Sequence, residues 1–118
     1  MAQSLFEKLW SHHAIADLGD GAALVLIDRI FLHERTGGIA LTSLEEAART
    51  PFAPRQAFCT MDHVVDTLPG RSDRTLMPTG TQFIQTTREA ARKAGITVFD
   101  LGDERQGIVH VISPEQGI

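Results

Sequence analysis

The stretch TQFIQTTREAARKAGITVFDL, residues 81–101, carries the clearest structural signal in the sequence. Its apolar and small side chains recur at helical spacing, and its charged side chains occupy the other positions. The recurring positions are Phe83, Ile84, Thr87, Ala90, Ala91 and Ala94. Gly95 stands where a glycine commonly ends a helix, and a short apolar run follows it. The stretch therefore predicts a helix over Thr81–Ala94 and then a strand over Ile96–Leu101.

Three further apolar stretches predict strands elsewhere in the chain. Ala57–Val65 and Gly107–Ile112 have the length and composition of short strands. Ala22–Leu32 is nearly continuous in its apolar character, which is typical of a strand buried on both faces. At Asp28 this run is interrupted, so a second short element starting there is an alternative to one long strand.

Helices are predicted between these strands. Ser4 and Glu7 have the spacing of a capping box and predict a helix at residues 5–13. A second capping box predicts a brief helix at Ser43–Arg49, and Asp66–Gly80 is the longest predicted loop. Strands that alternate with helices favour an α/β fold with a largely parallel sheet.

Glycines and strand ends complete this interpretation. Gly37 and Gly38 are interpreted as a break in regular structure before the helix at Ser43–Arg49. In open sheets of this kind, ligands bind beyond the carboxyl ends of the strands. Polar side chains at those ends are therefore the candidates for a functional site.

Composition and charge exclude several classes of protein. The chain has 118 residues and a formal net charge of −4, and we expect it to form one domain over residues 1–118. It has no run of basic residues that would neutralise a nucleic-acid backbone. Its longest apolar run is far too short to span a bilayer, and its first residues lack the order of a secretory signal. We expect a soluble cytoplasmic protein with no nucleic-acid or membrane partner.

The single cysteine limits the metal chemistry of this chain. Cys59 cannot form an internal disulfide, and one thiolate cannot hold an iron–sulfur cluster or a structural zinc ion. Cys59 also lies within an apolar strand pattern, where a buried and unreactive thiol is the common outcome. We therefore expect no metal ligands from this chain.

Three histidines fall at or near predicted strand ends. His33 is followed by Glu34, His63 is preceded by Asp62, and His110 lies within the string IVHVI. A histidine next to a carboxylate can move protons near neutral pH, which suits the dehydration of a hydroxy acid or its reversal. Successive strand residues point to opposite faces, so the Asp–His contact requires the chain to turn there. The alternative is that these are hydrogen-bonded histidines at a sheet edge.

Four strings carry a resemblance to a known family. They are SLFEKLW at residues 4–10, LVLIDRIFLHERT at 24–36, TMDH at 60–63 and QGIVHVISPEQG at 106–117. In this order and at similar separations, they resemble the start of the large subunits of 3-isopropylmalate dehydratase, which belong to the aconitase family. The last string is the most specific, and the resemblance covers almost the whole chain.

The resemblance implies a fold, a reaction and a set of residues. It implies a partial three-layer aconitase-type N-terminal domain, and the interconversion of 2-isopropylmalate and 3-isopropylmalate by dehydration and rehydration in leucine biosynthesis. Asp62, His63 and His110 match catalytic residues of the family, and His33 matches a substrate-binding position. The full-length family carries a 4Fe-4S cluster, whose iron acts as a Lewis acid, and pairs with a small subunit.

The sequence also departs from the family. Val64 follows the Asp–His pair where the family usually has asparagine, and Leu68–Met77 fits poorly. The resemblance places the cluster-binding cysteines beyond Ile118, so we expect no cluster on this chain alone and no activity in isolation. The alternatives are a non-catalytic truncated domain or interaction module, or part of a related homoaconitase or methylmalate-type isomerase.

A partial α/β domain is expected to expose apolar surface that further strands and helices cover in the complete fold. We therefore expect the chain to form a homo-oligomer through a sheet edge or through its first helix.

Overall fold

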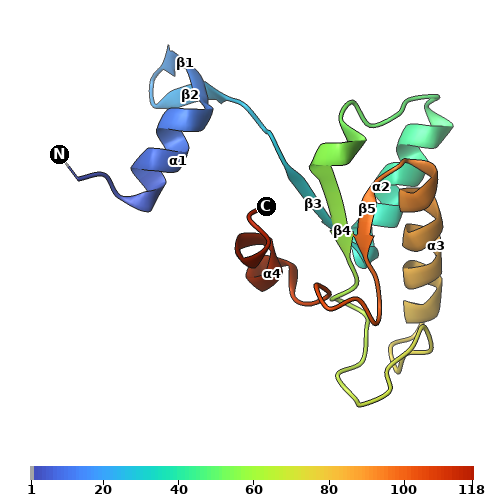
Figure 1. Ribbon diagram of the computed structural model, residues 1–118. Coiled ribbons are helices and arrows are strands. Elements are labelled where there is room, and N and C mark those ends of the chain that lie inside the picture. The colour runs from blue at the N-terminus through green and yellow to red at the C-terminus, as the bar shows by residue number, and fades with distance from the viewer. Residues whose placement is uncertain (1) are drawn as a thin grey trace.

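The protein is described by a computed structural model that covers residues 2–118. Its larger part, here called the body, comprises residues 30–118 and is built on a three-stranded sheet (Figure 1). The strands are β3 (Ile30–His33), β4 (Ala57–Thr60) and β5 (Thr97–Phe99), in that order across the sheet and all parallel. Their carboxyl ends therefore meet at one edge.

One face of the sheet packs against two helices, α2 (Glu34–Glu46) and α3 (Gly80–Lys93) (Figure 1). The buried side chains between them are Leu41, Ala57, Cys59, Ala90, Ala91 and Ile96. A second buried group, formed by Met61, Val64 and Ile84, extends this core toward the carboxyl edge. Helix α3 and strand β5 confirm the elements predicted from residues 81–101, with ends displaced by one or two residues.

The other face of the sheet carries an aromatic row. The Phe31, Phe58 and Phe99 rings lie with centroids 5.8–6.1 Å apart. Helix α4 (Val109–Glu115) lies beyond β3 on this side, opposite α2 and α3 (Figure 1). The body thus has a helical layer on either side of a parallel sheet, which confirms the predicted α/β class and its aconitase-type layering.

The crossing of α2 and α3 depends on a glycine within α2. A Cβ atom at Gly38 would stand 2.5 Å from Thr87 Oγ1 and 3.1 Å from the Thr87 backbone. Because such distances are too short for real contacts, the close approach requires a residue without a side chain. The prediction that Gly37 and Gly38 break regular structure, with a helix only at Ser43–Arg49, was wrong. Close packing against α3 offsets the poor helix propensity of glycine.

The apolar run at Ala22–Leu32 is not one buried strand. Its first part forms β2 (Ala22–Val25), which pairs antiparallel with β1 (Ala14–Gly19), and its last part forms β3. Asp20 has φ 51° and the flanking glycines have φ 81° and 77°, so the hairpin tip occupies the left-handed region. The alternative that a second element follows Asp28 is the correct one, and β2 is largely exposed.

Two other strand predictions need correction. The residues from Gly107 to Ile112 do not form a strand, because α4 begins at Val109. Their β-branched side chains favour a strand by propensity, but Val109 and Ile112 lie three positions apart and bury one helical face. The predicted strand at Ala57–Val65 ends early, at Thr60, since the chain turns after Met61.

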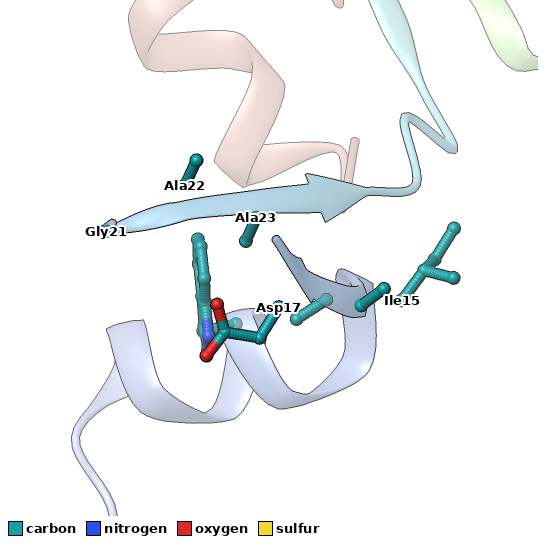
Figure 2. A pocket seen from close by; sticks show the side chains of 8 residues that line it. Ile15, Asp17, Gly21, Ala22 and Ala23 are labelled. Atoms are coloured by element: carbon teal, nitrogen blue, oxygen red, sulfur yellow. The ribbon is translucent and has the colours of Figure 1, made fainter. Parts of the chain in front are cut away.

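Residues 2–28 form a separate unit, here called the arm, which stands away from the body (Figure 1). It consists of the predicted helix α1 (Leu5–His13), with its capping box, and the β1–β2 hairpin. No residue of α1 is buried. A hollow of about 320 Å³ lies between α1 and the hairpin, and its lining includes one ionisable side chain, Asp17 (Figure 2).

Within residues 2–118, no helix has the length and apolar character needed to cross a membrane.

Candidate active site

The predicted site residues gather at the carboxyl edge of the sheet. His33 is the last residue of β3 and lies in register with Thr60, the last residue of β4. Asp62 and His63 follow Thr60 after one further residue. The parallel arrangement of β3 and β4 is therefore what brings these side chains together, although about thirty residues separate them in the sequence.

The chain turns after β4, and this turn allows Asp62 to contact its neighbour. Asp62 Oδ1 contacts His63 Nδ1, and Asp62 Oδ2 accepts a hydrogen bond from the Val109 amide at 2.8 Å. The Asp62 side chain is only 4% exposed, whereas the His63 side chain is 40% exposed. The carboxylate is thus fixed from two sides, and the other ring nitrogen of His63, Nε2, has no hydrogen-bond partner within residues 2–118.

The rings of His33 and His63 stack on each other. Their centroids lie 3.7 Å apart and their planes differ by 12°. Burial lowers the pKa of His33, and the nearby His63 and His110 lower it further, while Asp62 and Glu34 oppose the shift. His33 is therefore neutral at pH 7. Its Nδ1 atom is buried and has no hydrogen-bond partner among residues 2–118.

His110 lies near the same edge but on a different element from the one predicted. It lies in the first turn of α4 and is exposed. Its neighbour Val109 bonds Asp62, which places His110 beside the same edge. In the described part of the chain, no hydrogen bond or ion pair joins His110 to His33, Asp62 or His63.

The arrangement of the side chains at this edge decides how well they could bind a metal ion. One potential ligand atom from each of His33, Glu34, Asp62 and His63 lies within 4.8 Å of the others. An imidazole binds a metal through a lone pair in its ring plane, and two nearly parallel stacked rings cannot both direct that lone pair at one ion. In addition, the carboxylates of Glu34 and Asp62 already accept hydrogen bonds from backbone amides. This arrangement suits proton transfer better than metal coordination.

Glu34 is the member of this group that the sequence did not single out as a site residue. It begins α2 and is fully buried. Its position beside His33 is visible in the sequence, but its partners are the backbone amides of Asp62 and Val64. No pattern of residue types reveals a contact between a side chain and a distant backbone.

Comparison with protein families shows to which family this chain belongs. A family model described as aconitase family (aconitate hydratase) matches residues 7–118, which is nearly the entire sequence. The chain belongs to the aconitase family. No solved structure matches it. The chain is thus an aconitase-family hydro-lyase domain.

Aconitase-family proteins generally carry a 4Fe-4S cluster, and the residues of this chain do not fit one. Such a cluster is held by several cysteine thiolates. Cys59, the one cysteine, is 0% exposed and packs in the core between the sheet and its two helices. Burial raises its pKa to about 12, so it remains a protonated, inert thiol. The prediction that Cys59 is buried is confirmed.

Proposed function

We propose that this chain supplies the proton-handling side of the active site in a hydro-lyase large subunit that interconverts 2-isopropylmalate and 3-isopropylmalate. The observation that carries the proposal is the Asp62–His63 contact, stacked against His33 at the carboxyl edge of parallel strands. The resemblance of four strings to isopropylmalate dehydratase large subunits supports this substrate and a cytoplasmic role in leucine biosynthesis.

In this proposal, His63 transfers the proton to and from the oxygen that leaves or enters as water, and a base outside this chain takes up and returns the proton of the neighbouring substrate carbon. Its Nδ1 faces the Asp62 carboxylate, so Nδ1 retains a proton and Nε2 remains available to the substrate. In the protonated ring, Nε2–H donates to the departing hydroxyl group. In the reverse direction, the neutral Nε2 accepts a proton from the incoming water. Asp62 holds the ring orientation throughout, because Val109 fixes its second oxygen.

His33 serves as a neutral substrate-binding group. Because its pKa is lowered, it does not repel a protonated His63 stacked on it at neutral pH. His110, exposed at the start of α4, provides a further catalytic histidine on the same side.

The proposal extends to partners. A small hydroxy acid is the substrate, a small subunit completes the pocket that reads its side chain, and cysteines outside this chain hold the cluster. The isolated chain is then inactive. Anaerobic reconstitution of the 118-residue chain with iron and sulfide tests this directly. Cluster absorbance together with turnover of isopropylmalate would contradict it.

A binding and complementation experiment tests the catalytic role. The chain is co-expressed with a cluster-binding large-subunit segment and a small subunit, and dehydration of 3-isopropylmalate is followed. His63→Ala and Asp62→Asn are expected to lower kcat by roughly 10²–10⁴-fold. His12→Ala is the matched control, since His12 is exposed on α1. If His63→Ala retains wild-type turnover, the proposed role is wrong. Parallel assays with homoisocitrate and methylmalate distinguish the related isomerases.

The second candidate function is that of a non-catalytic interaction module that pairs with a second copy of itself. The arm favours it, because apolar side chains on α1 and the hairpin are exposed. They include Leu5, Phe6, Leu9, Trp10, Ile15, Leu18 and Leu24. Beside β3, a groove of about 550 Å³ is mostly apolar and is lined both by the body and by residues 26–29, at the end of the sheet order that β3 occupies. An arm that docks in the groove of a second copy would cover both surfaces.

A further inference from the structure

Glu34 is an unusual residue for the interior of a small domain. It is fully buried, and within residues 2–118 no lysine, arginine or histidine forms an ion pair with it. A buried carboxylate without a cationic partner is costly unless hydrogen bonds replace its lost hydration. The bonds that Glu34 accepts therefore indicate why a carboxylate occupies this position.

Both oxygens of Glu34 accept hydrogen bonds from one short segment. Oε2 accepts from the Asp62 amide at 2.8 Å, and Oε1 accepts from the Val64 amide at 2.5 Å. These amides lie on either side of His63 in the chain. Because one rigid planar group binds both, it fixes the backbone of residues 62–64 in the turn that follows β4.

This turn is what makes the Asp62–His63 contact geometrically accessible. In a continued strand, the two side chains would point to opposite faces of the sheet. Glu34 itself is held by a separate bond, in which buried Thr87 donates its hydroxyl to the Glu34 backbone carbonyl at 2.7 Å. The segment 62–64 is therefore fastened, through Glu34, to both α2 and α3.

We propose that Glu34 is a positioning residue, whose carboxylate clamps the amides flanking His63 and so holds the Asp62–His63 pair in its proton-transfer geometry. This inference rests on the proposed function for its catalytic meaning. The clamp itself is a property of the isolated chain, so it is measurable without turnover. Glu34 does not need to touch substrate to fulfil this role.

The test uses NMR on the 118-residue chain, with Glu34→Gln as the principal variant. Glutamine keeps the side-chain shape but replaces one acceptor oxygen by an NH₂ group that faces a backbone N–H. Hydrogen exchange at the amide of residue 62 or 64, relative to the Ile84 amide in the core, is expected to rise about tenfold or more. The fraction of His63 in the Nδ1–H tautomer is expected to fall, because its contact with Asp62 is released.

Thr87→Val is the matched control. It removes the hydroxyl bond to the Glu34 backbone carbonyl at nearly constant volume and leaves the carboxylate in place. It is expected to lower stability without changing the His63 tautomer or the relative exchange of residues 62 and 64. If Glu34→Gln leaves both readouts unchanged, or if the two variants change them equally, the clamp is refuted.

The unmodified chain provides a measurement that does not depend on how well a variant folds. The Asp62 and Val64 amides are expected to be protected, although they lie outside every helix and strand. The His63 amide between them, which has no acceptor among residues 2–118, is the internal reference. Equal exchange at all three positions would refute the clamp. A protected clamp in a chain that fails the complementation assay would instead count against the proposed function alone.

Discussion

The arm and the body are specified by the sequence in different ways. The arm has clear local signals, including a capping box in which Ser4 and Glu7 bond reciprocally and a hairpin tip in the left-handed region. Yet α1 buries no residue. The body has weaker local signals, with two glycines inside a helix, but it buries side chains on both faces of its sheet. Local signals thus define the elements, whereas burial defines their place in the fold.

The largest contrast is expected from truncating one apolar side chain in each region. Ile84→Ala removes a fully buried side chain of the body and is expected to lower the free energy of unfolding by about 2–5 kcal/mol. Leu9→Ala removes a side chain that is 52% exposed and is expected to change the free energy of unfolding by less than about 0.5 kcal/mol. Urea denaturation measures both. Equal losses would show that the arm belongs to the same cooperative core.

The next effect concerns association through the arm. Trp10→Ser removes an aromatic side chain that stacks with Phe6 at 5.8 Å between ring centroids. If the arm docks on a second copy, this change is expected to raise the dissociation constant at least about tenfold. Sedimentation equilibrium measures it, with Lys8→Ser on the same exposed helix as the control. A wild-type chain that stays monomeric at high concentration would contradict the docking.

A smaller effect is expected from removing the helix cap of the arm. Ser4→Ala loses the hydroxyl that accepts from the Glu7 amide, which is expected to destabilise α1 by about 1 kcal/mol. Amide exchange within α1 should increase. The urea midpoint of the body should not change, since α1 contributes no buried residue to it. A shifted midpoint would indicate coupling between the two regions.

The smallest expected effects come from two histidines, one in each region, whose pKa values are shifted in opposite directions. The pKa of His13 in the arm is raised, because its ring bonds the Leu9 carbonyl and faces Asp28 at 3.2 Å. The pKa of His33 in the body is lowered by burial. His13 therefore favours folding below the ordinary histidine range and loses that contribution as pH rises through its raised pKa. His33 disfavours folding increasingly as pH falls from about 6.5 through its lowered pKa.

Imidazole proton shifts followed by NMR from pH 4 to 9 measure both titrations. The His33 midpoint should lie below the ordinary histidine value of about 6.5, and the His13 midpoint above it. The reverse order would contradict the environments described for the two rings.

The sequence predicts those parts of the body in which one local pattern is enough to determine the secondary structure. Residues 81–101 combine helical spacing, a terminal glycine and a short apolar run, and α3 and β5 formed as expected. The errors arose where tertiary contacts outweighed local preference. At Gly38, a close crossing with α3 keeps glycine inside a helix. The IVHVI string forms a helix that buries Val109 and Ile112 on one face, and Asp62 bonds the Val109 amide in its first turn.

The candidate site was accessible to sequence reasoning only in part. Their places near predicted strand ends indicated His33 and His63, and the parallel pairing of β3 with β4, in which His33 lies opposite Thr60, brings them to one edge. The sequence indicates that the chain must turn for Asp62 to contact His63, but it does not reveal what causes the turn. Glu34 bonds amides that are 28 and 30 residues away, and backbone groups leave no trace in residue type.

The missing side chain at position 38 has an evolutionary consequence. Gly38 lies one helical turn after Glu34, and adding a single methyl group there would force α2 away from Thr87. Any lineage that acquires alanine at this position must also shrink residue 87 or allow the helix to tilt. Substitutions at 38 and 87 are therefore expected to arise together, so that the first turn of α2 keeps Glu34 in place.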